Sequence, residues 1–187
     1  MQLKMWRPAD MPIPEYPLAE GFSIRLMREG EEAMWSYSCL GEFNVTEVTE
    51  APFQRTMGDF PKDHIYFVCN KDDHPVATAS CQVKNEGEPF LHYIAVNPDY
   101  RGCKLAKPLI AQILKRHVEE GRNGCFLTTD DPRLPAIKTY LTLGYCPVLW
   151  SDDARERWEK ALAALGIERV AAYMPDLTQV EDIVAAK

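Results

Sequence analysis

The fold is decided by one stretch of the sequence, Tyr93–Ile110, which reads YIAVNPDYRGCKLAKPLI. An apolar strand ends near Val96, and the turn-forming residues Asn97–Asp99 follow it directly. Arg101-Gly102 then leads into a helix, because apolar side chains recur at helical spacing over Leu105–Val118. The stretch therefore predicts a strand, a tight turn and the start of a long helix.

The start of this helix has the properties of an anion site. Pro108 has no backbone N–H and fits best near the first helical turn, so we expect the helix to begin near Cys103 or Lys104. The first N–H groups of a helix lack internal partners, and the helix dipole favours negative charge there. Gly102 lets a phosphate approach the backbone closely. Basic side chains stand nearby at Arg101, Lys104 and Lys107. An ordinary strand-turn-helix junction with solvated basic residues would show the same local pattern.

The rest of the chain changes from antiparallel to strand-helix patterning. The period-2 and apolar runs predict strands, and apolar residues at helical spacing predict helices. Before the decisive stretch we expect strands at Phe22–Met27, Ile65–Cys69, Val76–Val83 and Pro89–Val96, with helices at Glu29–Leu40 and Phe53–Met57. After it we expect strands at Cys125–Thr129 and Tyr145–Trp150, with helices at Pro135–Leu143, Asp152–Leu165 and Val180–Ala186. This order predicts an α/β domain of mixed α+β type.

Length and composition limit the function classes. The 187 residues fit one domain over 1–187, with an irregular, proline-rich arm at 1–20 and a helical extension at 151–187. The net charge of −7, without a basic patch, argues against nucleic-acid binding. No apolar run is long enough for a membrane span, and no signal peptide is recognisable. The six cysteines form no CxxC pair, so we expect free thiols, no metal and a cytoplasmic location.

The decisive stretch resembles motif A of the GNAT superfamily, the GCN5-related N-acetyltransferases. In that motif an apolar strand end is followed by Asn/His-Pro-x-x-Arg-Gly-x-Gly, an apolar residue and Gly or Ala. The matching residues here are Ile94-Ala95-Val96, Asn97-Pro98, Arg101-Gly102, Leu105 and Ala106. Lys104 stands where the family usually has a small residue, and Asp99 where Gln or Arg is common. A backbone N–H remains available at Lys104, whose side chain we expect to point outward.

A second segment resembles motif B of the same superfamily, one helix and one strand further on. The segment runs from Leu134 to Tyr145, and Arg133 replaces the usual Asn before it. The residues in register are Ala136, Ile137, Tyr140, Gly144 and Tyr145. Two motifs at the family's spacing imply the GNAT fold over about Phe22–Trp150, a largely antiparallel sheet with a splayed parallel pair, flanked by helices.

The resemblance implies an acyltransferase that uses acetyl-CoA as cosubstrate and an amine as acceptor. It places the pyrophosphate at the loop and helix start, and the thioester carbonyl at a backbone N–H of the strand end. The implied cofactor-binding residues are Ile94, Ala95, Val96, Arg101, Gly102, Cys103, Lys104, Leu105, Ala106, Lys107 and Thr129. Tyr140 occupies the position of the proton donor to the departing thiolate.

The general base and the acceptor stay open. Strand alternation places Glu88, Phe90 and His92 on one face, so His92 and Glu88 are the candidate bases, and a water chain is an alternative. We expect the acceptor to be a small-molecule or peptide amine. We expect the N-terminal helices and the C-terminal segment to cover the acceptor side of the site or to form a homodimer contact. The main alternative is a non-catalytic acyl-CoA-binding sensor or interaction module. A nucleotide-binding Rossmann unit is disfavoured, because no GxGxxG follows the first strand.

Overall fold

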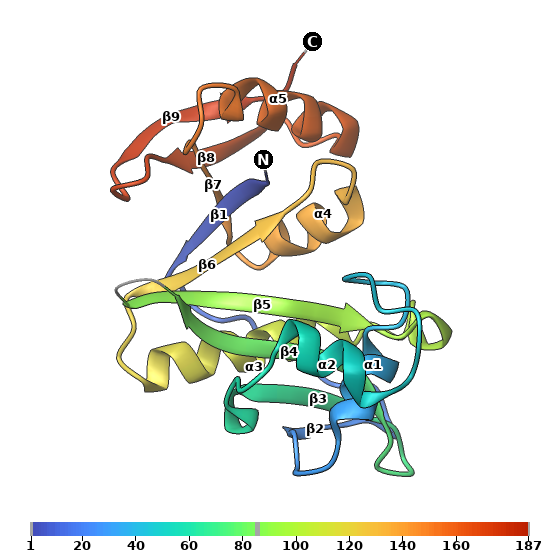
Figure 1. Ribbon diagram of the computed structural model, residues 1–187. Coiled ribbons are helices and arrows are strands. Elements are labelled where there is room, and N and C mark those ends of the chain that lie inside the picture. Colours follow the sequence, from blue (N-terminus) through green and yellow to red (C-terminus); the bar gives the residue numbers. More distant parts are fainter. Residues whose placement is uncertain (1, 85–86, 187) are drawn as a thin grey trace. The chain divides into compact units, whose positions relative to one another are not determined.

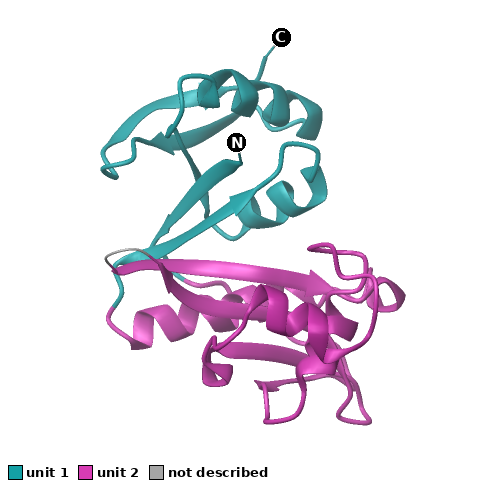
Figure 2. Ribbon diagram, viewed as in Figure 1, with its two compact units in different colours: residues 1–12, 122–187 teal, residues 13–121 magenta. Residues whose placement is uncertain are grey.

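The chain forms two compact units, which are described separately. The structure is a computed structural model that describes residues 2–84 and 87–186 (Figure 1). One unit is Ile13–Gly121, and the other combines Met1–Pro12 with Arg122–Lys187 (Figure 2). The N-terminal segment thus belongs with the second half of the chain. The expectation of a single domain over residues 1–187 stays a prediction.

An antiparallel sheet forms the centre of the unit Ile13–Gly121. Its strands follow one another in sequence order, and each pairs antiparallel with the next (Figure 1). They are β2 (Ser23–Leu26), β3 (Ile65–Cys69), β4 (Pro75–Lys84) and β5 (Glu88–Val96). The strands expected from the alternating pattern before the decisive stretch are therefore confirmed.

Helices cover both faces of this sheet. The helical elements of the unit are α1 (Glu32–Ser38), α2 (Glu50–Thr56), η1 (Lys62–His64), η3 (Pro98–Tyr100) and α3 (Ala106–Glu119). Ile65 packs in one cluster with α1 and α2, and its strand partner Ser80 lies on the same face. The next residue, Cys81, points to the other face, where its sulfur meets His117 of α3. Side chains that alternate along each strand therefore pack against α1 and α2 on one face of the sheet and against α3 on the other.

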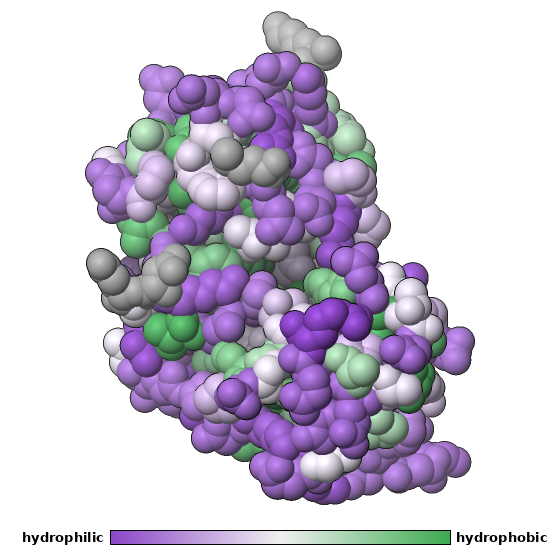
Figure 3. Space-filling view, in the orientation of Figure 1, coloured by the Kyte–Doolittle hydropathy of each residue, from purple (hydrophilic) through white to green (hydrophobic). Residues whose placement is uncertain are grey.

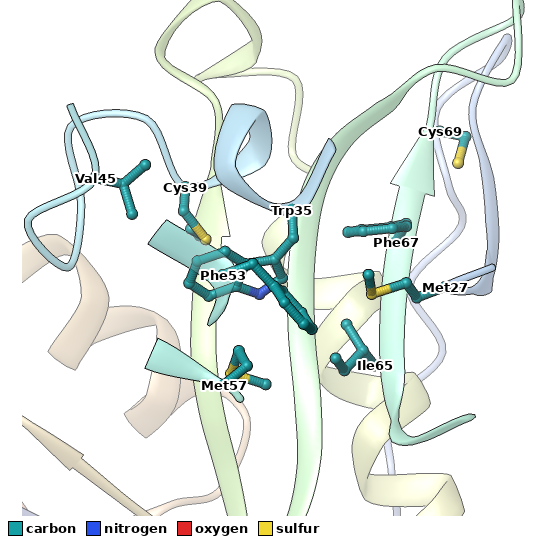
Figure 4. Packing of buried hydrophobic residues seen from close by; sticks show 10 residues of the cluster. Met27, Trp35, Cys39, Val45, Phe53, Met57, Ile65, Phe67 and Cys69 are labelled. Atoms are coloured by element: carbon teal, nitrogen blue, oxygen red, sulfur yellow. The ribbon is translucent and has the colours of Figure 1, made fainter. Parts of the chain in front are cut away.

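An apolar core cluster lies between β3 and the helices α1 and α2. The fully buried Trp35 meets Phe53 edge to face, with ring centroids 5.6 Å apart (Figure 4). Phe67 and Met27 pack in the same cluster. Burying a side chain of this size contributes about 1.5–3 kcal/mol, so this cluster stabilises the scaffold that holds β5 and the loop after it.

The second unit is a mixed sheet that carries two helices. Its elements are β1 (Leu3–Pro8), β6 (Gly124–Thr129), α4 (Leu134–Thr142), β7 (Cys146–Val148), α5 (Ala154–Leu165), β8 (Arg169–Tyr173) and β9 (Gln179–Val184). The strand order is β6-β1-β7-β8-β9. β1 is antiparallel to both neighbours, β7 pairs parallel with β8, and β8 and β9 form a hairpin. The mixed α/β fold class is confirmed, whereas the expected splay concerns β5 and β6, which belong to different units, and stays a prediction.

The irregular arm expected at residues 1–20 is wrong for β1. Met5 is fully buried, and the Trp6 ring packs at a tilt against Phe126 with centroids 4.4 Å apart. Buried side chains occur at both odd and even positions of β1, so the strand lacks the alternation that reveals a half-exposed strand. Gly124 makes room for Trp6, because a Cβ there would stand 2.2 Å from the indole. The prolines that suggested an arm begin only at the end of this strand.

The helical extension expected at 151–187 is correct for α5 and wrong for the tail. α5 ends at Gly166, which adopts the left-handed conformation of a helix C-cap. The helix expected at Val180–Ala186 is instead the strand β9, paired with β8. The backbone N–H of Thr178 donates to Asp176 Oδ1 at 2.9 Å, which fixes the turn between the two strands. The pairing of this segment with β8 makes it a strand, and the local sequence pattern carries no information about that pairing.

Length and apolar character decide whether a helix can cross a membrane. Within residues 2–84 and 87–186, every helix is too short or too polar to cross a membrane. Hydrophilic side chains cover most of the face drawn in Figure 3, and apolar residues are scattered among them. Single exposed apolar residues of this kind are normal on a protein surface.

Candidate active site

A β-bulge interrupts β5 just before the predicted site. Thr78 pairs with Ala95 and Ser80 pairs with His92, so Tyr93 and Ile94 together oppose Ala79 alone. A bulge leaves its extra residue outside the hydrogen-bonded ladder. The sequence resemblance placed the thioester carbonyl at a backbone N–H of this strand end, and the bulge is a local structure that can supply one.

The bulge holds Tyr93 in an uncommon backbone conformation. Its φ is +48°, in the left-handed region that bulky side chains rarely adopt. The ring packs edge to face against Trp35 and Phe43, with centroids 6.0 and 5.3 Å away. Burial also raises the pKa of the Tyr93 hydroxyl above its usual value. Aromatic packing thus stabilises a backbone geometry that the strand alone would not adopt.

A short, well-anchored turn follows β5. Asn97 is buried, and its Oδ1 accepts from the Asp99 N–H at 3.0 Å. Its Nδ2 donates to the Tyr37 carbonyl at 2.7 Å, which ties the turn to the end of α1. Pro98 begins η3, and this arrangement confirms the tight turn expected from Asn97-Pro98-Asp99. The Asn side chain therefore sets the direction in which the chain leaves the sheet.

The loop between η3 and α3 has two left-handed residues. Gly102 has φ +85°, and a Cβ built there would meet nothing within 4 Å, so the space above it is open. Lys104 has φ +60° and an exposed side chain. The residue that replaces the family's usual small residue therefore keeps the backbone conformation for which glycine is favoured. Its side chain points outward, as expected.

The N-terminus of α3 offers unpaired backbone donors. The helix begins at Ala106 with Leu105 as N-cap, slightly later than expected, and no side chain caps it. The helix has 14 residues, and its first turn contains no acidic side chain. Pro108 lies in this turn, where a missing N–H costs nothing. The free N–H groups and the helix dipole form a local environment that favours an anion.

The basic side chains around this helix start have different partners. Arg101 Nη2 donates to Glu42 Oε1 at 3.0 Å, so part of its charge is compensated. Lys107 Nζ lies 5.3 Å from the centre of the Tyr16 ring. Lys104 extends into solvent. Cys103 is half-buried in the loop, and its N–H donates to the Tyr100 carbonyl at 3.3 Å.

The candidate bases lie on one face of the β4–β5 hairpin. His92 is half-buried, and Lys84 Nζ lies 3.2 Å from its Nε2. Burial, and then the positive charge of Lys84, lower the pKa of His92 to about 4. Its imidazole is therefore neutral at pH 7 and a weak base. Glu88 is half-buried and stands opposite Lys84 in the strand register.

Tyr140 and Thr129, the remaining predicted site residues, belong to the other unit. Tyr140 lies on α4, is 7% exposed, and its ring meets that of Tyr145 at 6.0 Å. Thr129 is buried at the end of β6, opposite Leu3 of β1. Tyr145 is fully enclosed and its hydroxyl donates to Cys125 Sγ at 3.1 Å. Burial raises the pKa of Tyr145 well above its usual value.

A buried arginine that no sequence motif indicated supports α4. Arg7 on β1 is 1% exposed, and its Nε donates to the Leu143 carbonyl at the end of α4 at 2.7 Å. Its Nη2 donates to the carbonyls of Met11 and Pro12 at 3.1 and 2.8 Å. Burial lowers the pKa of this guanidinium below its usual value. A cation at a helix C-terminus is favourable, so Arg7 fixes the end of the helix that carries Tyr140.

A Cys-His-Glu cluster, in which Cys81 and His117 are buried and Glu120 is half-buried, lies near the other end of α3. Among residues 2–84 and 87–186, Cys81, His117 and Glu120 offer ligand atoms within 4.8 Å of one another. Cys81 Sγ is 3.5 Å from both ring nitrogens of His117. Thiolate, imidazole and carboxylate groups can all ligate a metal ion, and such groups also lie together in proteins without one. The expectation that the protein needs no metal stays a prediction.

Comparison with known proteins gives one family. The sequence profile of the Acetyltransferase (GNAT) family matches residues 25–145. That range includes β5, the loop at Gly102 and Lys104, α3 and the segment around Tyr140. A comparison with curated proteins returned no matching relative.

Solved structures with the same fold were also found. A GCN5-related N-acetyltransferase from Sphaerobacter thermophilus superimposes with a TM-score of 0.62 at 18% identity, over 78% of this chain and 48% of that chain. A putative acetyltransferase of the GNAT family from Novosphingobium aromaticivorans gives 0.57 at 21% identity, over 78% and 59%. A tandem GNAT protein from the clavulanic acid biosynthesis pathway gives 0.59 at 14% identity, over 78% and 50%. The chain thus spans only about half of the length of these proteins.

Proposed function

Because the chain belongs to the Acetyltransferase (GNAT) family, we propose that it transfers an acetyl group from acetyl-CoA to an amine by direct attack. One observation carries the proposal: the bulge at Tyr93 is followed, after the end of β5 and the short helix η3, by the left-handed residues Gly102 and Lys104 just before α3. A bulged strand supplies an N–H for a carbonyl, and a helix start supplies N–H groups for a pyrophosphate. Both parts of a thioester cosubstrate therefore have a backbone partner in one unit.

The chemistry needs one bond to form and one to break. The neutral amine nitrogen attacks the thioester carbon, and negative charge develops on the carbonyl oxygen. A backbone N–H at the bulge stabilises that charge. The C–S bond then breaks, and the CoA thiolate takes a proton that we assign to the Tyr140 hydroxyl. The amine loses its proton to a base, for which His92, Glu88 and water are the candidates.

Thiol release and cosubstrate binding test this function together. Acetyl-CoA binding is measured by calorimetry, and CoA release is measured with a thiol-reactive dye against lysine peptides, polyamines, amino sugars and arylalkylamines. We expect binding and amine-dependent thiol release. If CoA release is no faster with any amine than with buffer alone, the proposed transferase function is refuted.

Replacing Tyr140 with phenylalanine tests the proton donor. Loss of a general acid costs about 10²–10⁴-fold in rate, so we expect kcat to fall by at least about 100-fold. The affinity for acetyl-CoA should stay within about twofold, since Tyr140 holds no part of the proposed pyrophosphate site. Tyr173→Phe, on β8 of the same unit, is the matched control and should leave kcat unchanged. An unchanged kcat in Tyr140→Phe would exclude the assigned role.

A second candidate is an acyl-CoA-binding module without turnover. The observation that favours it is the pKa of about 4 of His92, which makes this candidate base weak at neutral pH. This reading predicts acetyl-CoA binding without amine-dependent thiol release.

We also propose a cytoplasmic location, which the six free cysteines support, and an acceptor that is a small molecule or a peptide. A homodimer is a further proposal that sedimentation would test.

A further inference from the structure

One face of the β4–β5 hairpin carries a line of polar side chains that leads to the bulge. The strand register places Lys84 opposite Glu88, Gln82 opposite Phe90 and Ser80 opposite His92. Paired residues share a face of the sheet, and so do alternate residues along each strand. His92 directly precedes the bulge residue Tyr93, so this face ends beside the backbone to which we assign the thioester carbonyl.

The contact between Lys84 and His92 determines where the imidazole carries its proton. Lys84 Nζ is 3.2 Å from His92 Nε2 and 4.4 Å from the centre of the Phe90 ring. The aromatic ring and the carboxylate of Glu88 across the strand favour the charged ammonium form. An ammonium group can only donate a hydrogen bond. His92 Nε2 must therefore accept, and a neutral imidazole then carries its proton on Nδ1.

Two buried polar atoms on the same face lack a partner. His92 Nδ1 and Gln82 Oε1 are buried and have no hydrogen-bond partner in the described part of the chain. With the tautomer set by Lys84, Nδ1 is a donor, whereas the amide oxygen is an acceptor. Gln82 and His92 are diagonal neighbours across the hairpin, within reach of one another's long side chains. A group that both donates and accepts, such as a hydroxyl or an amide, would satisfy both atoms.

We propose that Lys84 is a positioning residue that fixes His92 in the Nδ1–H tautomer, so that His92 serves the acceptor site as a hydrogen-bond donor and not as the general base. With Gln82, it binds a neutral hydroxyl or amide group of the acceptor. The proposal rests on the proposed transferase function for the identity of the ligand. It assigns deprotonation of the amine to another group or to water.

The tautomer is tested by nuclear magnetic resonance, which requires no turnover. Long-range ¹H–¹⁵N spectra distinguish a protonated from an unprotonated ring nitrogen, and His92→Asn identifies the His92 signals among the four histidines. We expect the proton on Nδ1. Lys84→Met should shift the population toward Nε2–H and raise the measured pKa of His92 toward 6.5. Lys71→Met, in an exposed turn of the same unit, is the control and should change neither. A proton on Nε2 in the wild-type protein would overturn the proposal.

The role in the acceptor site is tested by a pair of isosteric variants. Asn places an N–H near the position of His Nδ1, whereas Gln places its amide near Nε2. We therefore expect the acceptor KM of His92→Gln to be about tenfold higher than that of His92→Asn, the effect of losing one buried hydrogen bond. If His92 were the base, both variants would lower kcat equally and the proposal would be wrong. Absence of all amine-dependent release would contradict the transferase function, whereas the tautomer measurement would still stand.

Discussion

Replacing Lys104 with glycine should stabilise the protein. Lys104 has φ +60°, and an L-residue in this region costs about 1–2 kcal/mol relative to its preferred conformations. Glycine removes that cost but loses about 0.5–1 kcal/mol more chain entropy on folding. The exposed Lys104 side chain makes little packing that could be lost. The net gain in the free energy of unfolding should therefore be about 0.5–1 kcal/mol.

Urea unfolding and thermal melting of Lys104→Gly and Lys104→Ala measure this gain. Alanine removes the charge but keeps the Cβ, so it is the matched control for the backbone conformation. We expect the glycine variant to melt about 1–4 °C above the wild type with an unchanged denaturant m-value. The alanine variant should melt within about 1 °C of the wild type, because its backbone cost is the same. Equal stabilisation by alanine, or none by glycine, would refute the reasoning.

The same two variants separate two effects of Lys104 on acetyl-CoA. If the ammonium group attracts the pyrophosphate, both variants should lower the affinity equally, and the difference from the wild type should shrink in high salt. If the Cβ narrows the loop, glycine should raise the affinity and alanine should not. The outward side chain and the preserved left-handed backbone favour the first outcome. Calorimetry at two salt concentrations distinguishes them.

Two further predictions concern stability. Arg7→Met should lower the free energy of unfolding by about 3 kcal/mol, because the carbonyls of Leu143, Met11 and Pro12 lose their donor. Urea unfolding measures this loss, and Arg169→Met, at an exposed site, is the control. A loss below about 1 kcal/mol in Arg7→Met would contradict the prediction. His92, with a pKa of about 4 against 6.5 in the unfolded chain, should cost stability as the pH falls from 6.5 to 4, since the unfolded state binds the proton first. After allowance for the partial exposure of His92, we expect the free energy of unfolding to fall by about 1.5 kcal/mol over this pH range. The fall should be absent in His92→Asn. An equal fall in that variant would show that other groups cause it.

The sequence contained enough to predict the elements whose signal is local. The turn at Asn97-Pro98 follows from the chemistry of two adjacent residues, and the helical period after Leu105 extends over several turns. The segments that were predicted wrongly depend on distant partners. β1 is a strand because β6 and β7 flank it, and β9 is a strand because it returns along β8. A pattern within ten residues does not record such partners.

The candidate site divides in the same way. Gly102 and the helix start were predictable, because glycine, proline and helix periodicity constrain the backbone directly. The Lys84–His92 contact was not, since the two residues belong to different strands and meet only through the register that the hairpin adopts. Arg7 was hidden for the same reason, as the carbonyl of Leu143 lies 136 residues further along the chain. Motif matching recovers backbone chemistry better than it recovers side-chain partners.

Backbone strain is a further observation that supports the proposed site. Tyr93 and Lys104 are both L-residues in the left-handed region, and they lie at the bulge and at the helix start. Each costs about 1–3 kcal/mol and persists only where the surrounding structure imposes it. Stability alone would favour glycine at Lys104 and a regular strand at Tyr93. The two strained residues stand at the two positions to which the proposed function assigns a thioester carbonyl and a pyrophosphate, and we infer that ligand binding retains them there. Phe43, Asn44, Asp73 and Leu177 also have a positive φ, in segments to which the proposed function assigns no ligand.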